Sequence, residues 1–318
     1  MSLRAPSPVT NAAREWADPR ITSQGLGRTL AIAAATTGVA EILLYRAVVP
    51  VVVHVPGDGG ASLVTRILLD GAAVSMAATA LLVTAAAVVW GLALRRRHPI
   101  VATTILGVAA LTVAASASVG STTRLLAQAA TIAAVVAILV VATRISSPLH
   151  GVALAMAGIA IVASQWPLLL DALNLSSGDV VARTIAEAAL VATPIVFAAS
   201  VVRRGRASPA ALLAGIGAGL VIALVTVLEP TRMAGSLLWA IGVTMSLAPI
   251  AYVIAGACLT FVAVTWFRDR TERVLLAGLV LLAVAGIGPT AVHHNLAAVA
   301  GLVVMASAAE AFQSEKGI

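Results

Sequence analysis

Cysteine, aromatic residues and charged residues are all scarce in this sequence. Cys258 is the only cysteine among 318 residues, which excludes an intrachain disulfide bond and a metal site of the CxxC type. Only 10% of the residues are charged, whereas about 25% is usual in a soluble domain. A water-exposed surface cannot be built from so few charges, so we expect most of the chain to lie in an apolar environment.

Motifs of several enzyme classes are also missing. The sequence contains no Walker phosphate-binding loop, no Rossmann glycine pattern, no HExxH metalloprotease motif and no GxSxG nucleophile motif. No polar segment is long enough to hold an ATP-binding domain. An enzyme that acts on a lipid within the membrane would need a catalytic constellation, and the sequence offers none. These absences argue against an enzyme.

Long apolar runs are what the sequence has in abundance. Hydrophobic residues make up 60% of the chain, and the mean hydropathy is +1.04. Apolar runs of about 18 or more residues predict membrane-crossing helices, because a helix satisfies its backbone hydrogen bonds within one segment. The alternating polarity of a membrane β-barrel is absent. We predict an all-α, polytopic transmembrane bundle of about ten spans: 29–53, 63–94, 99–119, 123–143, 148–170, 180–202, 210–228, 235–267, 273–288 and 290–312.

Three of these spans have unusual features. The second has about 32 residues, or about 48 Å of helix, whereas a hydrocarbon core is only about 30 Å thick. The eighth contains Pro249, which predicts either a kink or a separate interfacial segment at 234–246. The seventh carries Gly215 and Gly219 as a GxxxG pattern, which is typical of close packing between helices.

The distribution of charge predicts how the chain is threaded. If successive spans cross the membrane in alternating directions, one side of the membrane holds fifteen basic and six acidic residues. The other side holds five basic and seven acidic residues. The net charges are therefore +9 (15 − 6) and −2 (5 − 7). Because basic residues are retained on the cytoplasmic side, we predict that both termini are cytoplasmic. Residues 1–28 are polar and lack a signal-peptide cleavage site, so we interpret them as a cytoplasmic tail, 29–312 as one transmembrane domain and 313–318 as a second tail.

The basic excess also bears on partners and location. The net charge is +7, but the basic residues stand at the ends of apolar runs, where they meet anionic lipid headgroups. We therefore expect a lipid bilayer as the partner and no nucleic acid. Both a homo-oligomer and a hetero-oligomer are compatible with the sequence. All basic residues except Lys316 are arginine, which with the many alanines and valines suggests a GC-rich genome. We expect a multi-pass protein of a prokaryotic plasma membrane.

A short pattern recurs at the outer start of three even-numbered spans. The segments TRILLDGAA, TRLLAQAAT and ARTIAEAAL each place a polar residue four positions after an arginine. The arginines are 58 and 59 residues apart, and prolines open several odd-numbered spans. A helical hairpin repeated about five times explains this spacing, and chance similarity of alanine-rich segments is the alternative. The three pairs are Arg66 with Asp70, Arg124 with Gln128, and Arg183 with Glu187.

Glu41 is the most informative single residue. It follows Arg28 by thirteen residues, or about 20 Å of helix, which places it inside the outer half of the hydrocarbon region. An ionisable group there costs about 2.5–3.5 kcal/mol and normally faces a cavity or a partner. We consider two interpretations. Glu41 binds a proton or cation in an outward-facing cavity, or it forms a structural ion pair with Arg46, Arg66 or Arg183.

Glu187 and Asp70 are the other candidate carboxylates. Arg183 and Glu187 share one face of a helix, because residues four apart are neighbours there. Glu187 lies sixteen residues before Arg203, again in the outer half of the membrane. Asp70 is expected nearer the outer surface, where arginines such as Arg66 reach the lipid headgroups.

Histidines suggest a metal or haem site. His54 is predicted at the same depth as His293 and His294, so His54 with one of these two could bind copper or zinc or ligate haem. Neighbouring helical residues point about 100° apart, so we expect that His293 and His294 do not share one ion. The alternative is that all are interfacial, as we expect for His98 and His150.

Two classes of function remain. The first is a secondary transporter or permease-like protein for a small solute or ion, with an outward-facing charged cavity. Glu41 and Glu187 would bind the substrate or the coupling ion, and Arg46 and Arg183 would balance their charge. Asp70 would contribute to binding at the outer edge. The second is a non-catalytic membrane subunit or assembly factor that binds haem or copper through its outer histidines.

Overall fold

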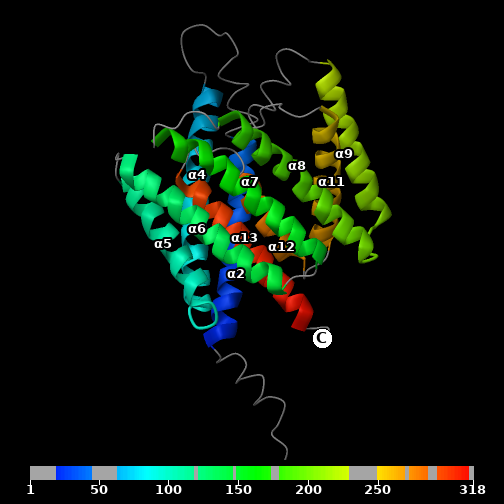
Figure 1. Ribbon diagram of the computed structural model, residues 1–318. Helices are drawn as coiled ribbons and strands as arrows, with labels where there is room; N and C mark the ends of the chain where they lie inside the picture. The colour runs from blue at the N-terminus through cyan, green and yellow to red at the C-terminus, as the bar shows by residue number, and fades with distance from the viewer. Residues whose placement is uncertain are drawn as a thin grey trace, which may run out of the picture.

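The computed structural model of the chain describes residues 19–44, 63–117, 121–145, 148–172, 179–228, 249–268, 272–285 and 292–314. Within these ranges the chain forms helices and short turns, without a strand (Figure 1). The helices are α2 (Pro19–Glu41), α4 (Leu63–Leu94), α5 (Pro99–Ala117), α6 (Ser121–Ile145), α7 (Pro148–Ala172), α8 (Asp179–Arg203), α9 (Pro209–Leu228), α11 (Pro249–Arg268), α12 (Arg273–Ala285) and α13 (Val292–Ser314).

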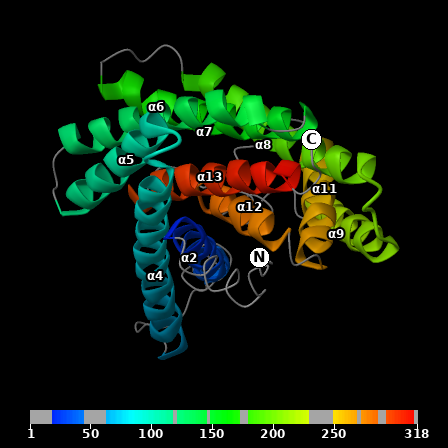
Figure 2. The same ribbon diagram turned by 90° about the horizontal axis from the view of Figure 1, so that it is seen from below.

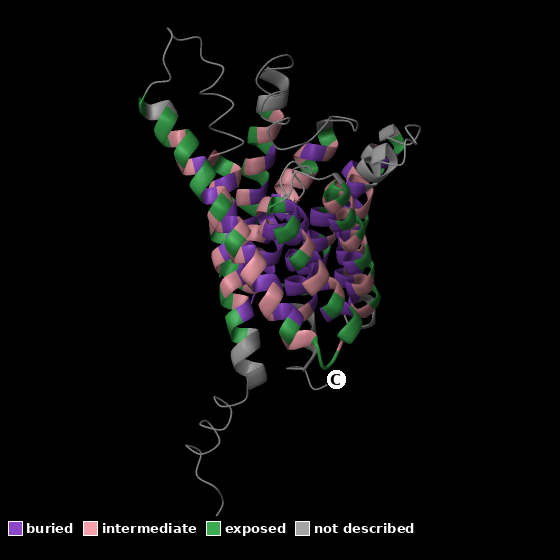
Figure 3. Cartoon of the chain, turned by 90° about the vertical axis from the view of Figure 1, so that its left-hand side faces the viewer, coloured by how far each residue is buried: buried purple, intermediate pink, exposed green. Residues whose placement is uncertain are grey.

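Seven of these helices are long and apolar enough to cross a membrane, namely α2, α4, α5, α6, α7, α8 and α11. Helices α9, α12 and α13 contain shorter apolar stretches. Large apolar side chains such as Leu81 and Ile100 are 73% exposed. Exposed residues line the outer faces of the helices (Figure 3). Exposed apolar surface of this kind is unfavourable in water but suits a helix surrounded by lipid. The fold indicates an integral, multi-pass membrane protein.

In the described part of the chain, each predicted apolar span contains one helix, although some boundaries differ. Helix α2 begins at Pro19, within the predicted tail, because helical hydrogen bonds are local and continue into polar surroundings. Helix α4 keeps the full predicted length from Leu63 to Leu94. Helix α11 begins at Pro249, with proline in a first turn that needs no N–H from it. The predicted stretches 45–53 and 234–246 lie outside the described residues.

Consecutive helices pack in pairs. The most extensive contacts join α2 with α4, α7 with α8, α9 with α11, and α12 with α13, and α5 also packs against α6. At the α2–α4 contact, the indole of Trp90 lies against Gly27, where a Cβ atom would meet the ring nitrogen at 3.0 Å. Five predicted hairpins therefore correspond to five packed pairs. That these pairs are copies of one repeated unit stays a prediction.

The GxxxG pattern packs α9 against α11, as predicted. A Cβ atom on Gly215 would lie 2.8 Å from the carbonyl oxygen of Ala257. On Gly219 it would lie 3.2 Å from the Ala257 Cβ. Gly217, between them, faces open space with nothing within 4 Å. The two outer glycines thus allow the backbones to approach closely.

Helix α13 is the buried centre of the bundle. Its side chains from residue 293 to 306 are all buried, and it packs against α2, α4, α5, α6, α7 and α12. Figure 2 shows it crossing the middle of the molecule, between α6 and α7 on one side and α2 and α12 on the other. Gly278 and Gly301 meet where α12 crosses α13, since a Cβ on Gly301 would lie 2.8 Å from the Gly278 carbonyl oxygen. A helix that is apolar on every face is buried in this way.

Connections from distant parts of the chain meet at one end of the bundle. The first turn of α2 and the last turn of α13 lie at this end (Figure 1). Gly205, with a φ of 67°, ends α8 in the left-handed conformation that glycine adopts easily. Arg206 then forms an ion pair with Glu272, which precedes α12. Arg268 at the end of α11 also donates a hydrogen bond to Ser208, at 3.3 Å.

Candidate functional site

Glu41 lies at the end of α2 and is buried within the bundle, with only 2% of its surface exposed. The next three residues, 42–44, continue as a π-helical turn. Gly38, one turn earlier, packs closely on α12, because a Cβ there would lie 2.7 Å from Val284. Single π-helical turns are rare in proteins, but those that occur are often at functional sites. The carboxylate therefore sits at a break in regular helix geometry, inside an apolar segment.

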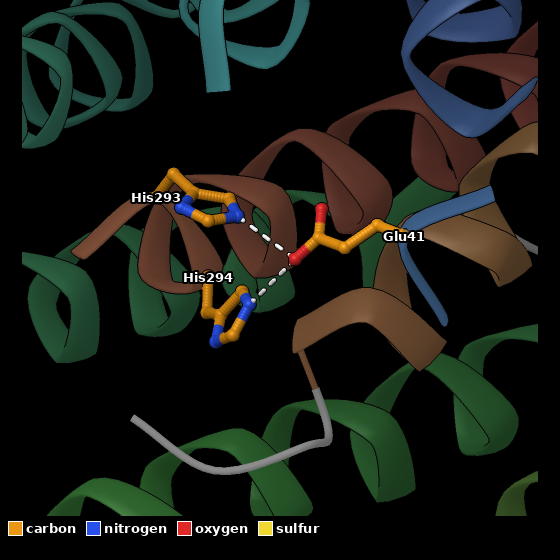
Figure 4. Close-up of side chains that lie close together, drawn as sticks. All are labelled: Glu41, His293 and His294. Carbon is orange, nitrogen blue, oxygen red and sulfur yellow. Dashed lines mark hydrogen bonds and ion pairs between the residues drawn. The ribbon is translucent and has the colours of Figure 1, made fainter. Parts of the chain in front are cut away.

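Two histidines bind this carboxylate. His293 and His294 lie in the first turn of α13, and both are buried. The Nε2 atom of each ring is 3.1 Å from the same Glu41 oxygen, Oε1. Figure 4 shows the two hydrogen bonds meeting at that atom. Because a carboxylate oxygen can only accept, each ring carries its hydrogen on Nε2 in this arrangement.

The convergence of the two histidines corrects the sequence-based expectation that they point apart. Their ring centroids are 4.5 Å apart, with 62° between the ring planes. An angle of about 100° between neighbouring side chains applies at Cβ, whereas an imidazole nitrogen lies several bonds further out. The flexible Glu41 side chain then reaches between the rings. Together Glu41, His293 and His294 form a group whose possible ligand atoms all lie within 4.8 Å of one another.

The hydrogen-bonding capacity of Glu41 is only half used. Its second oxygen, Oε2, is buried and has no hydrogen-bond partner among the described residues. A buried polar atom without a partner costs about 1–3 kcal/mol, and a charged group costs more. The site therefore has an acceptor directed into the protein interior that an additional positively charged or hydrogen-donating species would satisfy.

Of the three arginines that the sequence suggests as partners of Glu41, the structure describes the side chain of Arg66 alone. Arg66 is exposed on α4, and among the described residues the ion-pair partners of Glu41 are His293 and His294, not Arg66. The side chain of Arg183 lies outside the described set, as do Arg46 and His54. The sequence offered no direct signal for the pairing with α13, because Glu41 and His293 are 252 positions apart.

Glu187 forms a second buried site on a different pair of helices. Its side chain is 8% exposed, and its Oε2 atom accepts a hydrogen bond of 3.1 Å from the hydroxyl group of Tyr252 on α11. Sequence reasoning missed Tyr252. The available signal was its type and place, since it is one of only two tyrosines and lies in the middle of a predicted apolar span. Glu187 and Glu41 thus bind partners on different helices.

Asp70 does not join either buried carboxylate. Its side chain is exposed on α4, like that of Arg66 one turn before it. Of the three arginine-containing segments, only the one with Glu187 places a buried side chain four positions after its arginine. Gln128 in the second segment is half-buried. The related sequences therefore occupy different surroundings.

The histidine predicted to be interfacial at position 150 is instead buried. His150 is 2% exposed, its Nε2 atom lies 3.3 Å from the carbonyl oxygen of Met305, and its ring meets Phe197 edge-on. The cause is the central position of α13, which packs against α7 where the sequence suggested a membrane surface. Its contact with a backbone carbonyl gives it a structural role.

A further buried carboxylate, Glu272, lies at the end of the bundle where the α8–α9 and α11–α12 connections meet. It is 1% exposed and pairs with Arg206. Burial lowers the pKa of the nearby Arg204 guanidinium, although Glu272 opposes this shift and Arg206 adds to it. This cluster joins two connections and was not expected from the sequence.

Comparison with known proteins found no matching family model, no similar curated protein and no similar solved structure. The chemistry of the site must therefore be argued from its own residues.

Proposed function

We propose that this protein is a secondary transporter or permease-like protein for a small cation, and that Glu41, His293 and His294 bind the cation. The observation that carries the proposal is the buried carboxylate of Glu41 at the end of α2, hydrogen-bonded by two imidazoles from the first turn of α13. An ionised carboxylate in hydrocarbon needs a counter-ion. A bound cation would supply that charge.

The position of the site supports transport. Glu41 lies where α2 leaves regular helix geometry, and His293 and His294 lie where α13 begins. Transporters commonly bind their substrates at interrupted helices, where backbone and side-chain groups near helix ends are free to bind a ligand. The site joins α2, in the first helix pair, with α13, in the last. Its geometry would therefore change whenever these two pairs move relative to each other.

Other elements of the proposal extend the sequence-based predictions. We place ten spans in a prokaryotic plasma membrane with both termini in the cytoplasm, built from a repeated hairpin. Glu187, with Tyr252, would be a second carboxylate that binds the substrate or the coupling ion. Arg183 and Arg46 would balance the charge of the carboxylates in the outer half of the membrane. Asp70 has no role in this proposal, because its side chain is exposed on α4.

The test is cation uptake into liposomes that contain the purified chain. Radioactive or fluorescent assays would cover Na⁺, K⁺, Mg²⁺, Mn²⁺ and Zn²⁺. We expect uptake of at least one ion, and we expect Glu41→Gln to abolish it because the amide keeps the shape but loses the charge. Asp70→Asn is the matched control and should retain uptake. Normal uptake by Glu41→Gln would show that the assigned role is wrong.

A non-transporting membrane subunit that holds copper or haem is the second candidate, and the paired imidazoles are the observation in its favour. This candidate predicts a tightly held cofactor and no uptake of any ion. An absorption spectrum and metal analysis of the purified protein distinguish the two. A Soret band, or one copper per chain that survives dialysis, would favour the subunit.

A further inference from the structure

The donor atoms at Glu41 identify a class of cation. We propose that Glu41, His293 and His294 form a three-ligand site for a divalent transition-metal ion of the zinc type. This inference rests on the proposed function, because it names the cation that the transporter would carry. It adds a chemical preference that a carboxylate alone would not provide.

The ligand types favour a transition metal over the common cations. Imidazole nitrogen suits zinc, copper, nickel and iron, whereas calcium and magnesium prefer oxygen ligands only. Two of the three donors at this site are imidazole nitrogens. Sodium and potassium, which are also bound by oxygen atoms, gain nothing from these rings. The nitrogen content of the site therefore separates the zinc class from the other candidates.

The spacing of the donors is close to what one metal ion requires. Zinc binds imidazole nitrogen and carboxylate oxygen at about 2.0–2.2 Å, so two such ligands in a tetrahedral site lie about 3.4 Å apart. Each Nε2 atom is 3.1 Å from Oε1, and all three ligand atoms lie within 4.8 Å of one another. Small side-chain rotations would thus place the three donors around one ion.

Binding would change the hydrogen-bond pattern without requiring a charged ring. Each imidazole would move its hydrogen from Nε2 to Nδ1, so that the Nε2 lone pair points at the metal. The two hydrogen bonds to Oε1 would be replaced by bonds from the metal to the two nitrogens and to the carboxylate. The unpartnered Oε2 atom could also turn toward the ion.

The three ligands found among the described residues leave one position of a tetrahedral metal ion open. Structural zinc sites normally have four protein ligands, whereas sites with exchangeable ligands have three. An open position allows water, or another side chain, to enter as the ion arrives or leaves. This incomplete ligand set suits a transported ion better than a permanently bound one.

The experiment is a Co²⁺ titration of the purified full-length chain in detergent after metal has been removed with a chelator. Co²⁺ bound to nitrogen and oxygen ligands gives visible absorption bands that report its geometry. We expect one Co²⁺ per chain, displaced by Zn²⁺ but not by Mg²⁺ or Ca²⁺. Wild-type protein that shows no such bands, or loses them to Mg²⁺, would overturn the inference without any variant.

Variants locate the bound ion. His294→Gln, His293→Gln and Glu41→Gln should each weaken Co²⁺ binding by at least about 100-fold, because loss of an outer-shell partner alone costs up to that factor. His98→Gln is the matched histidine control and should bind as the wild type does. Retained size-exclusion and circular dichroism profiles would show that the variants fold. Unchanged Co²⁺ affinity in folded ligand variants would contradict the assignment.

The two proposals fail in different ways. If Co²⁺ and Zn²⁺ do not bind but uptake of another cation depends on Glu41, the metal assignment falls and transport stands. If the metal binds through the three residues but no ion crosses the membrane, transport falls and the metal site stands.

Discussion

Two glycine substitutions on one helix should have clearly different effects on stability. Gly215→Ala would place a Cβ atom 2.8 Å from the carbonyl oxygen of Ala257, closer than real Cβ contacts come. The new Cβ is bonded directly to the α9 backbone, and the carbonyl oxygen is part of the α11 backbone, so neither atom can rotate away. The two helices would have to separate by several tenths of an ångström. Overpacking of this kind costs about 1–3 kcal/mol. Gly217→Ala meets nothing within 4 Å.

The comparison isolates the packing contribution, because replacing glycine by alanine improves helix propensity by the same amount, about 1 kcal/mol, at both positions. One kcal/mol shifts the melting temperature by about 2–4 °C in proteins of 150–250 residues. We therefore expect Gly215→Ala to melt roughly 2–12 °C below Gly217→Ala in the same detergent. Equal melting temperatures would refute the close approach of α9 and α11.

Two further predictions concern Glu187 and the threading of the chain. Tyr252→Phe should lower stability by about 1.5–3 kcal/mol, the usual contribution of a hydrogen bond to a charged group. Unchanged thermal stability of Tyr252→Phe would contradict the bond to Glu187. In a Cys258→Ala background, single cysteines at positions 96 and 207 should resist a membrane-impermeant maleimide in intact cells and react after lysis. Labelling of either cysteine in intact cells would contradict the predicted topology.

The helices could be predicted from the sequence because their signal is local. Apolar runs of membrane-spanning length and prolines at helix starts marked out each of the predicted spans, and the GxxxG pattern correctly predicted close packing on α9. The errors lie at the ends, where helix α2 extends into the polar segment from Pro19. Hydropathy measures where lipid begins, whereas a helix ends only where its local hydrogen bonds stop.

The site could be predicted only in part because its contacts are not local. The predicted depth of Glu41 marked it as a group in need of a partner, and Glu41 is buried against two histidines, while its depth in a membrane stays a prediction. Its partners come from the last helix, and no pattern near Glu41 points there. The same applies to the hydrogen bond between Tyr252 and Glu187, which joins two helices. Burial of α13 decides both the position of His293 and the burial of His150, and a single sequence cannot show which helix is central.

X-ray absorption at the zinc edge of the Zn²⁺-loaded protein tests most directly whether Glu41, His293 and His294 form one cation site. We predict two imidazole nitrogens and at least one oxygen at about 2.0–2.2 Å, with one imidazole lost from the signal in His294→Gln. A shell made only of oxygen atoms, or a wild-type shell in the His294→Gln protein, would contradict the central claim.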